Sequence, residues 1–287
     1  MSSIEHKVVL NFTESRGFIK PPEELKKKEP LLLSPDNIEI LNPYDFKDLT
    51  ATWDILNDPQ QSYRFENQAE TPHVLSDIAR NPKVTVYVVK HPATHEIIAT
   101  ASTTDPSAKS REFETWWEHV ATRVDMHGRG IGTQLGEAIF FDKFFQRRGP
   151  GNKFAEKIYT AAIVDGDHGP ALKTMKKLGF IPRARWEKHI GVQAPVESAI
   201  EGIARSQRDE EERFDSVRWE LTRTMFLLGI IDGKYDYLNR AHVNEGIIGE
   251  AMAKNIDIAK LRQRVEAYKI RNDRSADMRD ILDPLGL

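Results

Sequence analysis

From Asn37 onward, the apolar positions repeat with the spacing of helices and strands. Phe46, Leu49 and Trp53 keep a helical period, and "PHVLSDIARNP" predicts a second short helix that stops before Pro82. Two runs of β-branched residues in "KVTVYVVKHPATHEIIATASTTD" predict a pair of strands joined by a turn. With "NIEILNP" before these elements and "SREFETWWEHVATRV" after them, the first half of the chain contains four predicted strands and two helices.

The second half of the chain alternates strands with helices. We expect a helix over residues 131–147, a buried strand in "KIYTAAIVD" and a helix in "HGPALKTMKKLGF" that ends at Gly179. The strands "FIPRARWEKHI" and "SVRWELTR" flank a helical insertion at about residues 194–213. This order predicts an α/β fold of the mixed α+β kind, in which one mixed sheet carries helices on both faces.

Changes of composition divide the chain into three predicted parts. Residues 1–35 form an N-terminal arm, because "KPPEELKKKEP" combines clustered charge with three prolines, which disfavour regular structure. We expect this arm to dock locally rather than to form a core of its own. Residues 36–228 form the main domain, and residues 229–287 form a helical C-terminal extension.

The C-terminal extension contains an apolar stripe at helical spacing. Its members are Ile258, Leu261, Val265 and Tyr268. The stripe can pack on the main domain, on a second copy of the chain in a homodimer, or on another protein. We expect packing on the main domain, since it needs no further assumption. Residues 231–287 hold ten basic and ten acidic residues, a balance that argues against a nucleic-acid-binding tail.

The overall composition narrows the classes of partner. The formal net charge is −3, so we expect no general attraction to nucleic acid or to an anionic membrane. No apolar run approaches the ~20 residues that span a bilayer, and the N-terminus lacks the apolar region of a signal peptide. The absence of cysteine excludes disulfides, thiolate metal sites and a cysteine nucleophile. The sequence therefore predicts a soluble cytoplasmic protein with no membrane or nucleic-acid partner.

Three glycines on alternate positions, Gly128, Gly130 and Gly132, stand where the helix over 131–147 begins. Without Cβ atoms, several main-chain N–H groups can converge on an anion, and the helix dipole adds a favourable potential. A Walker loop would need a Lys after the glycines, and a dinucleotide fingerprint would need Gly where Thr133 stands. The pattern therefore favours binding of a diphosphate group, with a simple tight turn as the alternative.

Two motifs resemble those of the GNAT superfamily of acyl-CoA-dependent N-acyltransferases. "VATRVDMHGRGIG" is similar to the family's strand, spacer and Arg/Gln-x-x-Gly-x-Gly/Ala loop. "HGPALKTMKKLGF" is similar to its Asn-x-x-Ala…Tyr-x-x-x-Gly-Phe helix. The resemblance covers about residues 37–226. It implies a GNAT-like fold with acetyl-CoA as co-substrate.

The resemblance also implies a set of cofactor-binding residues. The strand end whose backbone pairs with the pantetheine arm matches Val120, Ala121 and Thr122. The diphosphate loop and the start of its helix match His127, Gly128, Arg129, Gly130, Ile131, Gly132 and Thr133. His168 stands where the family often has an Asn that contacts the cofactor. His127 replaces the family's Arg or Gln, but binding should survive because main-chain amides are the donors that matter.

Acetylation of an amine needs a neutral amine, a polarised thioester carbonyl and a proton for the sulfur. Strand-end amides near Val120 can polarise the carbonyl. Met175 stands where the family often has a Tyr acid, and it cannot donate a proton. Glu114 and Glu118 are the candidate catalytic bases, because residues four apart in a strand point to the same side. A solvated surface role is the alternative for both carboxylates.

Other side chains near these motifs have weaker cases. His119 could be a base or an ordinary sheet histidine, and Asp165 or Asp167 could act through a water. The run from Asp165 to His168 offers too few well-spaced ligands for a metal, so no metal is expected. Of the adjacent pair Trp116–Trp117, one ring is expected in the core and the other toward an acceptor groove.

Two classes of function remain open. The first is an enzyme that moves an acetyl group from acetyl-CoA to a primary amine by direct transfer in a ternary complex. Its acceptor would be a small molecule or a protein amine. The second is a GNAT-fold protein that binds acyl-CoA as a sensor or scaffold without efficient chemistry. The glycine loop supports cofactor binding in both classes, and Met175 favours the second.

Overall fold

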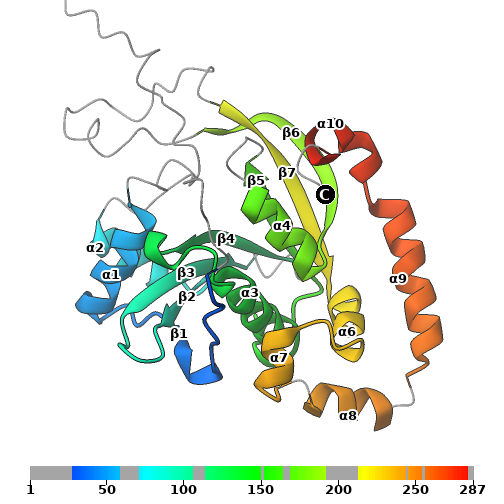
Figure 1. The fold of residues 1–287 in the computed structure, drawn as a ribbon, viewed down its shortest axis with the longest axis horizontal. Coiled ribbons are helices and arrows are strands. Elements are labelled where there is room, and N and C mark those ends of the chain that lie inside the picture. The colour runs from blue at the N-terminus through cyan, green and yellow to red at the C-terminus, as the bar shows by residue number, and fades with distance from the viewer. Residues whose placement is uncertain are drawn as a thin grey trace, which may run out of the picture.

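Seven strands form one mixed sheet with helices on both of its faces (Figure 1). The computed structural model describes residues 28–58, 71–105, 114–149, 152–163, 169–191, 213–243, 245–253 and 256–283. The strand order across the sheet is β1-β2-β3-β4-β5-β7-β6. The mixed sheet predicted from the sequence is therefore confirmed.

The elements follow the predicted order. The strands are Ile38–Ile40 (β1), Val84–Lys90 (β2), Ile97–Thr104 (β3), Glu114–Thr122 (β4), Lys157–Ile163 (β5), Ile181–Gly191 (β6) and Arg213–Thr222 (β7). The helices of the main part are Phe46–Leu56 (α1), Pro72–Arg80 (α2), Ile131–Phe141 (α3) and Gly169–Leu178 (α4). The later helices are Arg223–Ile231 (α6), Asp236–Arg240 (α7), Glu245–Ala253 (α8), Ile258–Asn272 (α9) and Arg279–Leu282 (α10). Short helical turns lie at Pro35–Asn37, Val124–Met126 and Ser275–Met278.

Strands β4 and β5 are the parallel neighbours in a sheet whose other described neighbours are antiparallel. Their ladder contains three residue pairs, from Glu114–Lys157 to Trp116–Tyr159. Strand β4 continues to Thr122 beyond the end of this ladder. Strands β4 and β5 are therefore paired with each other only over these first residues, among those that the structure describes. Beyond them, the edge of β4 that faces β5 is unpaired.

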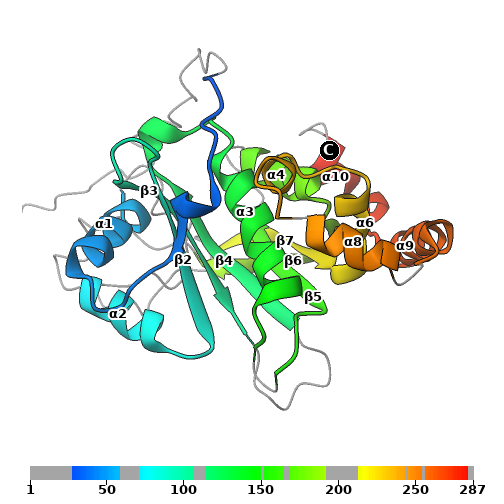
Figure 2. The ribbon, with the colours of Figure 1, turned by 90° about the horizontal axis from the view of Figure 1, so that it is seen from below.

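Two apolar clusters lie on opposite faces of the sheet. Helices α1 and α2 cover one face and contribute Leu49 and Leu75 to its cluster. Helices α3 and α4 cover the other face, where Leu135 and Leu172 belong to the same cluster as Trp117 of β4. Figure 2 shows α1 and α2 on one side of the strands and α3 on the other. The two faces at the centre of the sheet are thus distinct surroundings for the side chains of β4.

Local signals account for the helix ends. The Asp45 carboxylate accepts the N–H groups of Lys47 and Asp48 at the start of α1, and the Thr71 hydroxyl accepts the N–H of Val74 at the start of α2. Helix α4 ends at Leu178, and Gly179, which follows it, has a left-handed φ of +95°. The α-helix α3 ends at Phe141, and a π-helical turn follows it over Asp142–Gln146. The helix expected over 131–147 is therefore largely confirmed. The predicted insertion at 194–213 lies outside the described residues, except for its last position.

Both ends of the described chain pack against the main domain. Leu33 of the arm is buried in the cluster under α3, as expected for local docking. Leu261 and Val265 of α9 are buried, and α9 contacts α6 and β6. The predicted intramolecular docking of the stripe is confirmed, so the stripe gives no reason to infer a homodimer. The three-part division stays a prediction, since the boundary at residue 228 falls within α6.

None of the helices in the described ranges has the length and apolar character needed to cross a bilayer.

Candidate functional site

The three glycines lie in the connection from β4 to α3. Gly128 and Gly130 have φ values of +80° and +74°, in the left-handed region that favours glycine. Gly130 is the N-cap of α3, so the N–H groups of Ile131, Gly132 and Thr133 have no acceptor within the helix. A Cβ at Gly130 or Gly132 would meet no atom within 4 Å. Open space and main-chain donors therefore coincide at the start of α3.

The loop is tied back to the end of β4 by His127. Its Nε2 atom donates to the carbonyl oxygen of Thr122 at 2.8 Å. His127 thus supports the shape of the loop.

A β-bulge interrupts β4 just before the loop. Ser102 of β3 pairs with Glu118 and Thr100 pairs with Ala121, so His119 and Val120 together oppose one residue of β3. His119 has a φ of +51°. Beyond this extra residue, each side chain of β4 points to the opposite face of the sheet from the one that regular alternation would give. Val120 packs on the cluster under α3, whereas Ala121 is buried in the cluster under α1.

The edge of β4 that faces β5 is unpaired past Trp116 among the described residues. This stretch includes the bulge and the predicted pantetheine-binding residues Val120, Ala121 and Thr122. An extended ligand can add to such an edge as a further strand would. The unpaired edge leads directly to the glycine loop, so one ligand can follow both.

Glu114 and Glu118 lie on the same face of β4, as predicted. Both are half-buried, whereas Thr115 and Trp117 between them are buried, Trp117 in the cluster under α3. Glu118 Oε2 accepts a hydrogen bond from Thr104 Oγ1 at 2.7 Å. Glu114 Oε1 lies 3.4 Å from the Tyr159 hydroxyl and 4.0 Å from Lys157 Nζ. Glu118 is therefore beside the bulge, and Glu114 is beside the paired start of β5.

Aromatic rings and a guanidinium group lie beside these carboxylates. Trp116 and Tyr159 have ring centroids 5.7 Å apart. The guanidinium of Arg218 lies 3.9 Å from the Tyr159 centroid and 5.4 Å from that of Trp116. Trp117 is fully buried and packs edge-on against Phe140. The prediction that one of the two tryptophans belongs to the core is confirmed for Trp117.

Glu220 connects this face to the C-terminal extension. It pairs across the sheet with Tyr159, is buried, and accepts a hydrogen bond from the Tyr268 hydroxyl of α9. Burial, with the carboxylates of Glu220 and Glu114, raises the pKa of the Tyr159 phenol well above its usual range. Tyr159 is therefore a neutral hydrogen-bond donor at physiological pH.

The remaining predicted residues lie in different surroundings. His168, Asp165 and Asp167 lie outside the described residues, so their roles stay predictions. Met175 is buried in the cluster under α3 and α4. His119 Nδ1 lies 3.0 Å from Ser102 Oγ. In the described part of the chain, no group of three or more His, Asp or Glu side chains could hold a metal ion.

Sequence reasoning missed Gln134, Glu137, Tyr159 and Arg218. Gln134 and Glu137 are buried polar residues of α3 that bond segments far away in the sequence. Their signal is visible in "IGTQLGEAIFF", where two polar residues interrupt an otherwise apolar helix. Tyr159 and Arg218 carry no such signal, because only the strand pairing places them beside β4.

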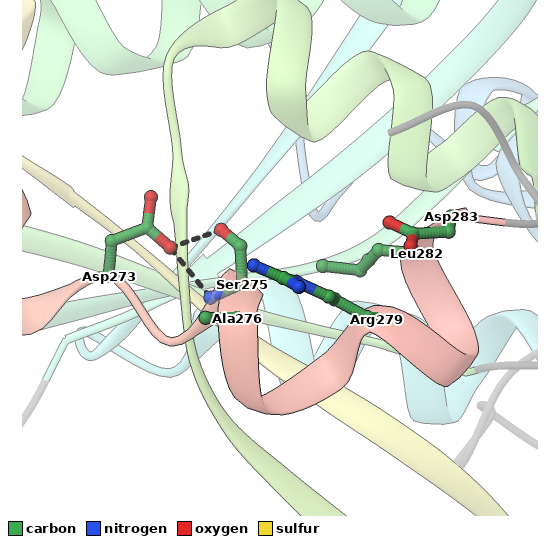
Figure 3. A pocket seen from close by; sticks show the side chains of 6 residues that line it. All are labelled: Asp273, Ser275, Ala276, Arg279, Leu282 and Asp283. Atoms are coloured by element: carbon green, nitrogen blue, oxygen red, sulfur yellow. Dashed lines mark hydrogen bonds between the residues drawn. The ribbon is translucent and has the colours of Figure 1, made fainter.

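A separate hollow of about 380 Å³ lies at the C-terminal end (Figure 3). Its lining residues are Asp273, Ser275, Ala276, Arg279, Leu282 and Asp283. The Asp273 carboxylate accepts hydrogen bonds from the N–H and the hydroxyl of Ser275. The hollow shares no residue with the glycine loop or with the carboxylate face of β4.

One mixed sheet with helices on both faces, and the succession of strand, glycine loop and helix, are the features that the sequence predicts. The chain has the mixed α/β fold that the sequence predicts.

Comparisons with solved structures find N-acetyltransferases. Spermidine N-acetyltransferase from Vibrio cholerae, in complex with CoA and spermine, is 13% identical, with 66% of this chain and 96% of that chain covered and a TM-score of 0.49. Ribosomal-protein-S5-alanine acetyltransferase from Vibrio fischeri is 13% identical, with coverages of 65% and 92% and a TM-score of 0.47. NAA60 of Arabidopsis thaliana, with a bisubstrate analogue, is 14% identical, with coverages of 64% and 96% and a TM-score of 0.45. No protein-family model and no curated protein matches the chain.

Proposed function

We propose that this GNAT-fold chain is an acetyl-CoA-dependent N-acetyltransferase. It moves an acetyl group to a primary amine by direct transfer in a ternary complex. The observation that carries the proposal is the unpaired edge of β4, which leads into main-chain N–H donors and open space at the start of α3.

The residues present fit the co-substrate. Ile131, Gly132 and Thr133 offer N–H groups to the diphosphate, and the dipole of α3 favours its charge. The strand edge over residues 120–122 offers backbone groups to the pantetheine arm. Gly128 and Gly130 provide the turns that bring these two parts together. Acetyl-CoA, when bound, supplies the activated acetyl group.

Glu118 is our choice for the general base. It removes a proton from the ammonium form of the acceptor, and the amine nitrogen then forms a bond to the thioester carbonyl carbon. The nitrogen of the adduct then loses its extra proton to solvent. The C–S bond breaks and the thiolate leaves, taking a proton from solvent because Met175 has none to give. Glu118 is favoured over Glu114 because it adjoins the bulge, whereas Glu114 lies at the paired start of β4 and near the Lys157 cation.

The acceptor in this proposal is a small-molecule or protein amine. Two carboxylates, Glu114 and Glu118, lie on one face of β4, and their negative charge attracts a cationic amine. This face lies on the same side of the sheet as α1 and α2, since Trp117 on the other side packs under α3.

A second candidate is an acyl-CoA-binding sensor or scaffold without efficient chemistry. The burial of Met175 favours it, because the position that often carries the family's acid belongs here to the core. Like the transferase, such a sensor would bind acyl-CoA through the glycine loop and the edge of β4. Unlike the transferase, it would not need Glu118 as a base.

Calorimetry with CoA and acetyl-CoA tests the shared part of both candidates. We expect the wild type to bind and Gly132→Val to bind at least tenfold more weakly, because the branched side chain fills the open space at the N–H groups. Gly249→Val is the matched control, since Gly249 also lies in a helix with no atom within 4 Å of an added Cβ. Equal binding by wild type and Gly132→Val would contradict the proposed site.

Thiol release from acetyl-CoA separates the two candidates. The acceptor panel contains a polyamine, a peptide with a free α-amino group and a peptide with an internal lysine. Release stimulated by an amine supports the transferase. Tight binding with no release on any of these amines supports the sensor.

A further inference from the structure

Gln134 in the first turns of α3 joins the N-terminal arm to the glycine loop. Its side chain is buried, and its amide nitrogen donates to the carbonyl oxygens of Leu31 at 2.7 Å and Gly130 at 3.4 Å. Its amide oxygen accepts from the Leu33 N–H at 3.0 Å and from Arg240 Nη2 at 2.6 Å. All the hydrogen-bonding groups of this side chain are thus used in holding backbone or a cation from other segments.

The arm also contacts the loop directly. The Leu31 N–H donates to the carbonyl oxygen of Arg129 at 3.1 Å, and Lys28 Nζ donates to that of Asp125 at 2.9 Å. Figures 1 and 2 both show the blue segment of the arm running beside α3. The arm is therefore bonded to the connection on both sides of Gly128.

These bonds fix the direction of the peptide groups in the loop. The peptide from Arg129 to Gly130 is trans, so its C=O and N–H point in opposite directions. Because the Arg129 carbonyl is held toward Leu31, the Gly130 N–H points away from the arm. A glycine-rich loop left without such ties has many accessible conformations, and a ligand must use part of its binding free energy to select one.

We propose that Gln134 and the arm segment 28–33 are positioning residues that preorganise the diphosphate loop. This inference rests on the proposed function, because it takes the loop to bind the diphosphate of CoA. The arm acts through the loop backbone and needs no contact with the ligand. Binding of the diphosphate should therefore depend on it, and binding of the pantetheine arm should not.

The test measures the affinities of full-length variants for CoA and for acetylpantetheine, which lacks the diphosphate. Gln134→Leu removes every bond of the amide, and Gln134→Glu keeps the oxygen that serves Leu33 and Arg240 but loses both donations. Gln263→Leu in α9, where Gln263 is exposed, is the matched control. Circular dichroism and thermal melting identify the variants that fold. If Gln134→Leu does not fold, the comparison is made with Gln134→Glu.

We expect CoA affinity to fall at least tenfold in the folded Gln134 variants, with acetylpantetheine affinity unchanged and Gln263→Leu like the wild type. Unchanged CoA affinity in a folded variant overturns this inference alone. So does an equal loss for both ligands, because it indicates a general structural role. A wild type that binds no CoA overturns the proposed function and this inference together.

Discussion

The carboxylate of Glu137 in α3 accepts the backbone N–H of Tyr237 in the first turn of α7 at 2.9 Å, across a separation of 100 residues. It also lies 3.4 Å from the N–H of Leu238. Glu137 is only 3% exposed, and burial raises the pKa of its carboxyl to about 7 despite these two bonds, which lower it. A titratable group thus joins the C-terminal extension to the helix that carries the glycine loop.

Stability is expected to depend on pH through Glu137. Its folded pKa of about 7 lies above the ordinary value of 4.5, so the native state binds the proton more tightly than the unfolded state. The associated stability is complete below pH 4.5 and is lost as the pH rises through 7. Relative to Glu137→Gln, the free energy of unfolding of the wild type should fall by about 3 kcal/mol from pH 4 to pH 8.

Urea unfolding of both proteins at several pH values measures this difference. Taking the difference removes the other titrating groups, which the two proteins share. Glutamine keeps an oxygen that can accept the N–H groups of α7 and has no proton to lose. Parallel pH profiles for the two proteins would show that Glu137 titrates normally.

Gly130 and Gly132 should differ in their effect on stability. Gly130→Ala places a Cβ at a φ of +74° and should lower the free energy of unfolding by about 1–2 kcal/mol. Gly132→Ala meets no atom within 4 Å and has helical backbone, so it should be neutral or stabilising by up to about 1 kcal/mol. Chemical denaturation measures both. Equal losses at the two positions would mean that the loop conformation differs from the one described.

Glu118→Gln should reduce kcat by about 10²–10⁴-fold if Glu118 is the general base. The affinity for acetyl-CoA should not change, because the diphosphate loop and the strand edge are intact. Glu114→Gln should have a smaller effect, since Glu114 lies at the start of β4, where β4 is paired with β5. Thiol-release kinetics on an active amine give kcat, and calorimetry gives the affinity. A larger loss for Glu114→Gln would transfer the role of base to Glu114.

Leu261→Ala should destabilise the whole domain if α9 is part of its fold. Leu261 is buried, and removing such a side chain typically costs about 2–5 kcal/mol. Ile270→Ala in the same helix is the control, because Ile270 is 77% exposed and should change stability by less than about 0.5 kcal/mol. Thermal melting should show one transition at a lower temperature. A separate early transition would instead show that α9 unfolds on its own.

Much of the fold could be predicted because its signals are local. The helical period of Phe46, Leu49 and Trp53, the turn at Gly179 and the glycines before α3 depend on neighbours within a few residues. The shared face of Glu114 and Glu118 also follows from the two-residue period of a strand. These parts of the site could be placed before any tertiary contact was known.

The chain's own periodicity therefore determined the element order, the mixed sheet and the location of the glycine loop. Only the tertiary structure decided how the loop is held, because Gln134 bonds Leu31 and Arg240, each more than 100 residues away. It also decided the bulge at His119, which depends on the register between β3 and β4, and the placing of Tyr159 and Arg218 beside Trp116. Pairings of this kind depend on which distant segments come into contact, and no spacing within one segment contains that information.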